Sequence, residues 1–325
     1  MSADVTFGVL GLGSIGTRHA ANLAALGRDV LAFDPSEEVR RHAQSNGTQV
    51  TADREDVLEK SQAVIIASPN GFHLQDMKDA VGAECHLFVE KPLAHVTDGV
   101  KEVLDDAAAK GLTVFAGLNL RFHPAVKAAK LLLDDGALGT PLWAIFQSSH
   151  WLPDWRPDQD YAQGYAADPE TGGVLFDIIH EFDLANHLLG PAETLFATAR
   201  NTGTIDIPSE DCADVVLGHQ TGVRSILHLD YVTRPTRRVA EIGGDRGIIR
   251  LDLVAQKVTL ITHDGTVSEN QNFAETGLND PYIKEMSAFI DCIEKKKPPP
   301  CDGYEALAIL EQVIAARRQC GLPGS

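Results

Sequence analysis

The sequence of 325 residues predicts an α/β protein. We expect a doubly wound parallel sheet first, and then an α+β domain with an open, largely antiparallel sheet. Up to Gly117, short apolar runs alternate with segments of helical spacing, which is typical of parallel sheets. After Gly117, strand-like segments follow one another across short turns, which indicates antiparallel pairing. The length and this change of pattern predict two domains, residues 1–118 and residues 119–325.

The first domain is expected to alternate strictly between strand and helix. Gly27 follows the first expected helix at a position typical of a C-cap. Apolar runs predict strands at 5–10, 29–33, 63–67, 87–89 and 112–116, and helical spacing predicts helices at 15–26, 36–45, 73–81 and 97–110.

The second domain is expected to combine helices with consecutive strands. A loop rich in Trp, Pro and Asp precedes its second helix, and the Lys- and Pro-rich stretch 295–300 is interpreted as a solvated connector. The pattern predicts helices at 124–134, 174–189, 281–295 and 304–319, and strands at 142–148, 195–201, 213–219, 223–231, 238–242 and 247–253.

The composition excludes several classes of partner and of protein. The net charge of −18, from 46 acidic and 28 basic residues, repels nucleic acids and anionic lipids, so neither is expected as a partner. No apolar run approaches the roughly 20 residues that cross a bilayer, and the start of the chain lacks the features of a signal peptide. The five cysteines form no CxxC pair, which favours free thiols in a reducing cytoplasm.

A glycine-rich turn follows the first expected strand and opens the first expected helix. Gly11 permits the tight turn, Gly13 lets the backbone approach a pyrophosphate, and Gly16 lets the helix pack closely on the strand. The helix N-terminus offers free N–H groups to the phosphates. The pattern therefore predicts a Rossmann-type dinucleotide-binding domain in which Gly11, Gly13, Ser14, Ile15 and Gly16 contact the cofactor.

Asp34 stands at the end of the second expected strand, about 20 residues after the glycines. A carboxylate at this position accepts hydrogen bonds from the adenosine ribose hydroxyls and repels a 2′-phosphate. We therefore expect NAD as the cofactor, with NADP less favoured. The alternative is that Asp34, which precedes Pro35, is only a turn or helix-capping residue.

Further motifs follow in order along nearly the whole chain. They are Ser68-Pro69-Asn70 with His73, Glu90-Lys91-Pro92, the segment from Asn119 to Pro124, and the segment 168–173 leading to Asp177, His180 and Asp183. Together with the glycine turn, these motifs resemble the Gfo/Idh/MocA family of sugar and polyol oxidoreductases. The resemblance implies cofactor contacts by Ser68, Pro69, His73, Glu90, Lys91 and Asn119, a catalytic role for Lys91, and a cis Lys91–Pro92 bond.

Hydride transfer from a carbinol needs a cation near the developing alkoxide and a base for the hydroxyl proton. Lys91 follows a strand end, where open α/β sheets bind ligands, and His180 supplies an imidazole, the side chain whose unperturbed form titrates near neutral pH. Asp177 lies three residues before His180 on one expected helical face, whereas the family pattern has four, which puts the role of Asp177 in doubt. The alternative is a surface lysine and an ordinary polar pair on a helix.

The loop before this helix carries side chains that suit a polyhydroxylated substrate. Trp151, Trp155 and Tyr165 offer aromatic faces, and Arg156 suits the carboxylate of a sugar acid. Lys91, Arg121, Asp177 and His180 complete the expected substrate contacts. A packed surface loop or an oligomer contact explains the Trp-rich segment equally well.

Two other interpretations compete with that of an NAD-dependent dehydrogenase. A zinc site could in principle draw on His150, Asp177, His180, Glu181 and His228, but no HExxH or cysteine cluster supports one, and we expect no metal. A non-catalytic sensor of dinucleotide or sugar is the alternative function, because this fold alone does not define an activity. The sheet of the second domain is expected to carry helices on one face only. Its uncovered face is suited to self-association, which predicts a homodimer or homotetramer.

Overall fold

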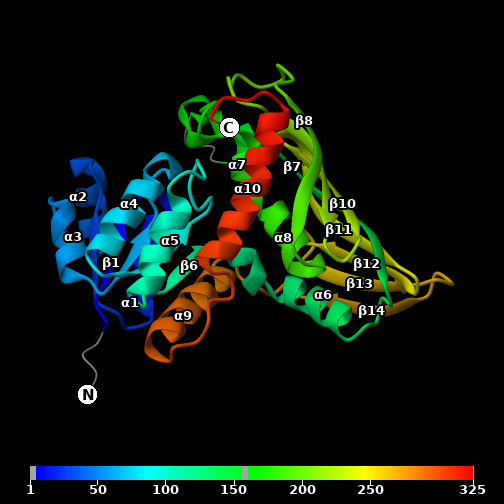
Figure 1. The fold of residues 1–325 in the computed structure, drawn as a ribbon, viewed down its shortest axis with the longest axis horizontal. Coiled ribbons are helices and arrows are strands. Elements are labelled where there is room, and N and C mark those ends of the chain that lie inside the picture. Colours follow the sequence, from blue (N-terminus) through cyan, green and yellow to red (C-terminus); the bar gives the residue numbers. More distant parts are fainter. Residues whose placement is uncertain (1–4, 156–159, 325) are drawn as a thin grey trace. The chain divides into compact units, whose positions relative to one another are not determined.

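The computed structural model describes residues 5–155 and 160–324, which form two compact units (Figure 1). The first unit holds the chain up to Asn119 together with Pro281–Leu310, and the second holds Leu120–Asp280 and the residues from Glu311 onward. The division into functional domains at residue 118 stays a prediction, but residues 281–310 pack with the first unit. Among the described residues, no helix has both the length and the apolar character that a membrane span requires.

The first unit contains a parallel sheet with the strand order β3-β2-β1-β4-β5-β6. Its central strands are buried and almost wholly apolar, as expected where helices cover both faces. The strands are β1 (Phe7–Leu10), β2 (Val30–Phe33), β3 (Gln49–Val50), β4 (Ala63–Ile66), β5 (His86–Glu90) and β6 (Val114–Gly117), and the helices are α1 (Ser14–Ala25), α2 (Glu37–Ser45), α3 (Arg54–Lys60), α4 (Asn70–Gly82) and α5 (Val100–Ala109).

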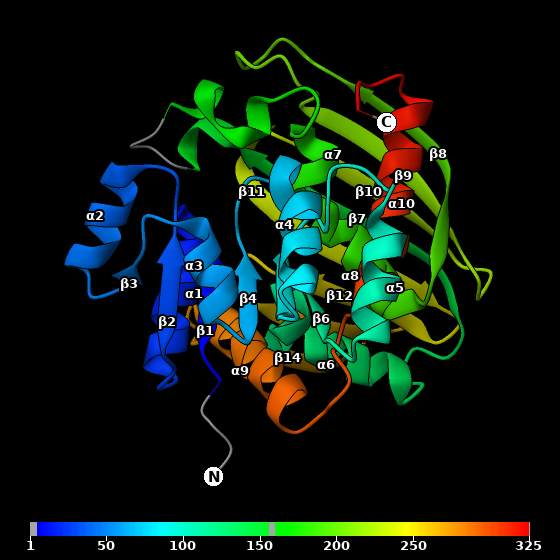
Figure 2. The same cartoon turned by 60° about the vertical axis from the view of Figure 1, so that its left-hand side comes forward.

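Helix α9 (Asp280–Glu294) explains why late residues belong to the first unit. The ring of Phe289 lies edge-on to the rings of Phe7, Phe88 and Phe115, at centroid distances of 6.2, 5.6 and 5.7 Å. These rings come from β1, β5 and β6, so α9 closes the core of the parallel sheet (Figure 2). Burial of such aromatic rings is a large contribution to the stability of a core.

The second unit contains a sheet with the strand order β14-β13-β12-β11-β7-β10-β9-β8, in which only the β7–β10 pair is parallel. Helices α6 and α8 pack on one face of this sheet (Figure 1). Its strands are β7 (Pro141–Trp151), β8 (Ala192–Arg200), β9 (Cys212–His219), β10 (Arg224–Asp230), β11 (Val232–Gly244), β12 (Gly247–Asp252), β13 (Lys257–Thr262) and β14 (Val267–Asn272), and its α-helices are α6 (Pro124–Asp134), α7 (Gly173–Asp177), α8 (Ile179–Leu189) and the end of α10 (Gly303–Gln319).

The two faces of this second sheet differ in burial. Along β7, Ala144 and Phe146 are buried beneath the helices, whereas Trp143 and Ile145 point to the other face and are exposed. This alternation is the period of two that an antiparallel sheet covered on one side requires. Short 3-10 helices complete the described elements: η1 (Asn119–Phe122), η2 (Leu152–Asp154), η3 (Tyr161–Gln163) and η4 (Tyr165–Ala167).

The predicted fold class is confirmed, whereas the bounds of some predicted helices are corrected. The helix expected at 174–189 is interrupted at Ile178, whose backbone lies at φ −93° and ψ 28°, so it forms α7 and α8. Helix α4 begins at Asn70, before the expected residue 73. The elements α3, β3, β13 and β14 were not predicted. Strand β3 has only two residues and the exposed β14 is almost entirely polar, whereas β13, with Val258, Leu260 and Ile261, has the composition of a strand and was missed.

Candidate active site

The glycine turn of the first unit is shaped by close backbone approaches. Gly11 has φ +90°, and a Cβ atom there would lie 2.7 Å from the carbonyl oxygen of Ala67. A Cβ atom on Gly16 would lie 1.9 Å from the carbonyl oxygen of Gly11. A Cβ atom on Gly13, in contrast, would have open space around it, with no atom of the described residues within 4 Å. No side chain caps the N-terminus of α1. The first N–H groups of α1, including those of the exposed Ser14 and half-buried Ile15, suit an anionic ligand.

Asp34 lies beside this turn. Its Oδ2 accepts a hydrogen bond of 2.9 Å from the backbone N–H of Leu12, and its Oδ1 accepts one of 2.9 Å from Ser36. The turn-residue interpretation is therefore correct as far as Ser36 is concerned, but the carboxylate also contacts the glycine turn. A carboxylate accepts about four hydrogen bonds, so it retains capacity for ribose hydroxyls.

The Ser68–Pro69 loop leads from β4 into α4 and lies against Gly11, whose Cβ position would be 2.7 Å from the backbone nitrogen of Ser68. His73 is buried, with Nε2 2.8 Å from the carbonyl oxygen of Ser68 and Nδ1 2.8 Å from that of Pro92. Both ring nitrogens of His73 therefore face protein carbonyls. The structure favours an indirect role for His73 toward a cofactor, through the loop that it holds.

Glu90 is the last residue of β5, and Lys91 and Pro92 follow it, at the sheet edge where the Gly11 turn and the Ser68 loop also lie. The Lys91–Pro92 peptide bond is cis, as the family resemblance implies. Glu90 is only 7% exposed, whereas Lys91 is half-buried. Asn119, which follows β6 at the same edge, is buried and begins η1. The expected cofactor residues of the first unit thus gather at the carboxyl ends of its strands, where such sheets bind ligands.

In the second unit, Asp177 is held by two phenols. Its Oδ1 accepts a hydrogen bond from the hydroxyl of Tyr165, and its Oδ2 lies 3.1 Å from the hydroxyl of Tyr231. Burial, and then the charge of Asp177, raise the pKa of Tyr231 well above its usual value, so this phenol keeps its proton and donates. Because α7 ends at Asp177, the assumption that Asp177 and His180 share one regular helical face is wrong.

Ring contacts connect Tyr231 to Trp155 through His150. Tyr165 is 39% exposed and Trp155 is 48% exposed, and the ring of His150 lies 4.7 Å from Trp155 and 5.3 Å from Tyr231 between centroids. The half-buried Trp151 carries the guanidinium of Arg234 3.8 Å above its ring. Arg156, expected to bind a carboxylate, lies outside the described residues.

Arg121 and two of the residues considered for zinc have charged partners within the second unit. Arg121 is buried, and its Nε and Nη2 donate to Asp183 Oδ1 at 2.8 and 2.5 Å, so its contact with substrate stays a prediction. Of the residues that could in principle bind zinc, Glu181 pairs with Arg238 at 2.7 Å, and His228 pairs with Asp214 at 2.7 Å. Within the described part of the chain, no three His, Cys, Asp or Glu side chains form a group that could hold a metal ion.

A buried ion pair that the sequence did not reveal supports the loop before α7. Arg317 Nη1 lies 3.1 Å from Glu210 Oε1 and donates to the carbonyl of Gly172 at 3.2 Å. Its Nη2 donates to the carbonyl of Pro169 at 2.8 Å, and Glu210 accepts from the N–H of Leu175 at 3.3 Å. This pair fixes the start of the short helix that ends at Asp177.

Comparison with known proteins agrees with this geometry. Residues 5–118 match the model of an oxidoreductase family with an NAD-binding Rossmann fold, which defines the chain as an oxidoreductase of this class. Residues 126–250 match the Gfo/Idh/MocA C-terminal domain. The chain therefore belongs to the Gfo/Idh/MocA family.

Similar proteins span the whole chain. An inositol 2-dehydrogenase of Rhizobium meliloti is 29% identical, over 98% of this chain and 99% of the relative. A myo-inositol 2-dehydrogenase of Thermotoga maritima is 27% identical, over 96% of this chain and 95% of the relative. The structure of a levoglucosan dehydrogenase with NADH and levoglucosan has a TM-score of 0.89 at 18% identity, covering 98% of both chains, and so shares the fold.

Proposed function

We propose that this protein is an NAD-dependent dehydrogenase that transfers a hydride between the nicotinamide and a carbinol or carbonyl carbon of a sugar, polyol or sugar acid. The observation that carries the proposal is the position of Lys91, directly after β5, at the sheet edge that also bears the glycine turn. The names of the relatives, which include inositol and sugar dehydrogenases, support this substrate class.

The proposed chemistry assigns one role to each group. The bound nicotinamide supplies the hydride acceptor. The ammonium of Lys91 donates a hydrogen bond to the reacting oxygen, and His180 accepts the hydroxyl proton, so that loss of proton and hydride leaves a carbonyl. Asp177, already oriented by Tyr165 and Tyr231, accepts a hydrogen bond from a second substrate hydroxyl.

A substrate panel tests this proposal. Purified protein is incubated with NAD⁺ and, one at a time, myo-inositol, scyllo-inositol, levoglucosan, D-xylose, D-glucose and D-gluconate, and formation of NADH is followed by absorbance. We expect oxidation of at least one compound of this class. Tight NADH binding without oxidation of any sugar, polyol or sugar acid, in a panel enlarged to the remaining common isomers, would contradict the proposal and favour a sensor.

Asp34→Ala is expected to weaken NAD binding by about tenfold or more, because the charge-assisted hydrogen bonds that a carboxylate accepts from ribose hydroxyls are worth about 1.5–3 kcal/mol. Affinity for NADP should rise relative to NAD, because the repulsion of the 2′-phosphate is removed. Titration of both cofactors by intrinsic fluorescence measures the change. Asp53→Ala, which removes the carboxylate that caps α3, is the control. Wild-type protein that binds NADP more tightly than NAD would refute the assignment.

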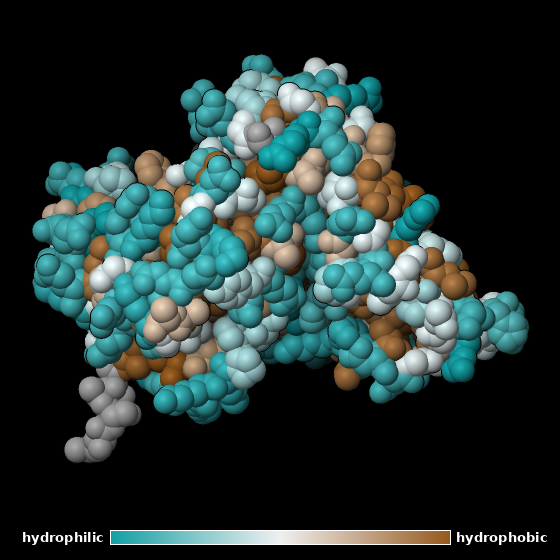
Figure 3. Space-filling model, in the orientation of Figure 1, coloured by the Kyte–Doolittle hydropathy of each residue, from teal (hydrophilic) through white to brown (hydrophobic). Residues whose placement is uncertain are grey.

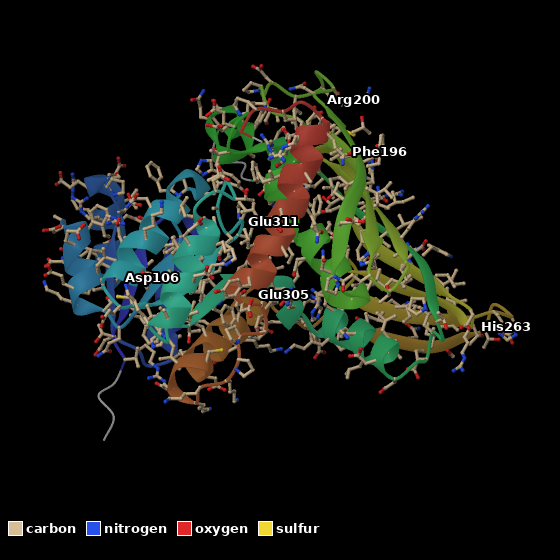
Figure 4. The ribbon with its side chains drawn as sticks, in the orientation of Figure 1. Asp106, Phe196, Arg200, His263, Glu305 and Glu311 are labelled. Atoms are coloured by element: carbon tan, nitrogen blue, oxygen red, sulfur yellow. The ribbon has the colours of Figure 1, made fainter. Side chains whose placement is uncertain are left out.

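We also propose that the protein self-associates through the uncovered face of the second sheet. A row of apolar side chains crosses four strands in register: Phe196 on β8 lies beside Val216, Val216 beside Ile226, and Ile226 beside Ile145. Phe196 is 57% exposed and is labelled in Figure 4. Figure 3 shows apolar surface where β8 lies in Figure 1. Exposed apolar patches of this kind mark protein interfaces.

Light scattering at micromolar concentration is expected to give the mass of a dimer or tetramer. Ile226→Asp should shift the protein toward the monomer, because the charge falls in the middle of the apolar row. Leu131→Asp, which alters an exposed apolar residue on α6, should leave the mass unchanged. A monomeric wild-type protein would contradict this proposal.

A further inference from the structure

The three residues Glu90, Lys91 and Pro92 are held on both sides by histidines from different helices. On one side, His19 Nε2 of α1 lies 2.6 Å from Glu90 Oε1. The other carboxylate oxygen of Glu90 accepts the backbone N–H of Lys91 at 3.1 Å. On the other side, His73 Nδ1 of α4 lies 2.8 Å from the carbonyl oxygen of Pro92. Lys91 therefore lies between two anchored neighbours.

The position of His19 is fixed by its surroundings. The residue is fully buried, and its ring lies edge-on to Phe88 at 4.9 Å and to Tyr282 at 6.1 Å. Glu90 is buried as well, and a buried carboxylate is costly unless hydrogen bonds compensate for the lost water. The contact with His19 supplies such compensation, so removal of the imidazole is expected to release the Glu90 side chain.

His73 joins two segments of the same sheet edge. Its two nitrogens face the carbonyl oxygens of Ser68 and Pro92, both at 2.8 Å. Burial lowers the pKa of His73, while these two hydrogen bonds and the charges of Glu90 and Asp76 act in the opposite direction. A neutral imidazole carries one N–H and can donate to one carbonyl at a time. Conservative substitutions can therefore separate the contact with Pro92 from the contact with Ser68.

We propose that His19 and His73, here named the histidine clamp, are positioning residues that fix the backbone on both sides of Lys91 and so direct its ammonium. The inference rests on the proposed function of Lys91. The clamp histidines project from α1 and α4, the helices that begin at the glycine turn and at the Ser68–Pro69 loop. The helices expected to hold the cofactor thus also hold the lysine.

Amide hydrogen exchange, read by mass spectrometry on a peptide that contains Lys91, tests the clamp without a substrate. When Gln replaces a histidine, its side-chain amide nitrogen lies near the position of Nε2. When Asn replaces a histidine, its amide nitrogen lies near the position of Nδ1. We expect His19→Asn and His73→Gln, which lose the contacts to Glu90 and Pro92, to exchange about fivefold faster or more, in keeping with the worth of one hydrogen bond. His19→Gln and His73→Asn keep those contacts and should stay near the wild-type rate.

Kinetics on the panel compound that is oxidised fastest gives the second readout. His19→Asn and His73→Gln should lower kcat by about tenfold to a hundredfold, because a shift of about 1 Å in a reacting group costs this much. KM and the dissociation constant for NADH should change by less than about threefold in these two variants, because His73→Gln keeps the contact with Ser68, and the partner substitution His19→Gln should restore most of kcat. His86→Asn is the control: His86 begins β5, and its Nδ1 accepts the N–H of Thr113 at 2.9 Å, at the other end of the same strand.

The outcomes are distinguishable. Normal turnover of Lys91→Ala would overturn the proposed role of the lysine, and the exchange experiment would still decide whether the clamp holds the segment. Wild-type exchange in His19→Asn and His73→Gln would overturn the clamp. Exchange that is accelerated equally in the Asn and Gln variants at each position would also overturn it, because a general effect on folding does not depend on which nitrogen is replaced.

Discussion

Lys91→Ala is expected to lower turnover by about a hundredfold or more, because it removes the cation that stabilises the developing alkoxide. His180→Ala should cost a similar factor through loss of the general base. Steady-state kinetics on the compound identified in the panel measures both. NADH affinity should change little, because Asp34 and the glycine turn are unaltered in both variants.

Matched controls make these losses specific. Lys101→Ala removes an exposed lysine of the first unit that pairs with Asp105 at 2.7 Å. His187→Ala removes a histidine of α8, the helix of His180, and burial lowers the pKa of His187 to about 4, so it is neutral at pH 7. Near-normal turnover in both Lys91→Ala and His180→Ala would refute the assignment, and a base from the segment 151–165 would then be sought.

Arg317→Ala is expected to lower the free energy of unfolding by about 3–5 kcal/mol, the usual cost of leaving a buried charge without its partner. The arginine is fully buried and pairs with Glu210, which is also buried. Urea denaturation measures the loss. Arg318→Ala, which alters the exposed neighbour on α10, should fall within about 0.5 kcal/mol of the wild type. A loss no larger than that of Arg318→Ala would refute the assigned role of the pair.

The same variant has a predictable pH dependence. Burial raises the pKa of Glu210, and Arg317 opposes this shift, so the pKa should rise further in Arg317→Ala. A carboxyl group whose folded-state pKa is raised favours the folded state at low pH and destabilises it as the pH rises above its unfolded value. The stability deficit of Arg317→Ala is therefore expected to be largest at neutral pH and to shrink on acidification.

The sequence predicted the fold where the local pattern and the tertiary environment agree. Buried parallel strands such as β4 appear as continuous apolar runs, and the glycine pattern from Gly11 to Gly16 predicts the start of α1. The break at Ile178 had no such signal, because buried residues follow one another along α7 and most of α8, so that no helical period marks the end of one helix and the start of the next. A Cβ atom on Gly173 would lie 2.2 Å from the carboxylate of Glu210, a constraint that only the folded chain reveals.

In the candidate site too, residues in a local motif could be predicted from the sequence, whereas contacts between distant residues could not. Residues contiguous in sequence, such as Glu90, Lys91 and Pro92, could be singled out from their motif. Partners that the fold brings together from afar could not: Tyr231 is 54 residues from Asp177, and Arg317 is 107 residues from Glu210. Sequence spacing predicts contacts within one helix or turn, whereas these contacts depend on how strands and helices pack.

The return of residues 281–310 to the first unit bears on how the protein is made. A ribosome that has released residues 1–118 has produced all the strands of the parallel sheet, but Phe289 is still to be synthesised. Until then, the rings of Phe7, Phe88 and Phe115 lack the aromatic neighbour that closes their core. The nucleotide-binding unit therefore completes its folding only after nearly the whole chain has been translated, and the nascent sheet must be kept from aggregating in the meantime.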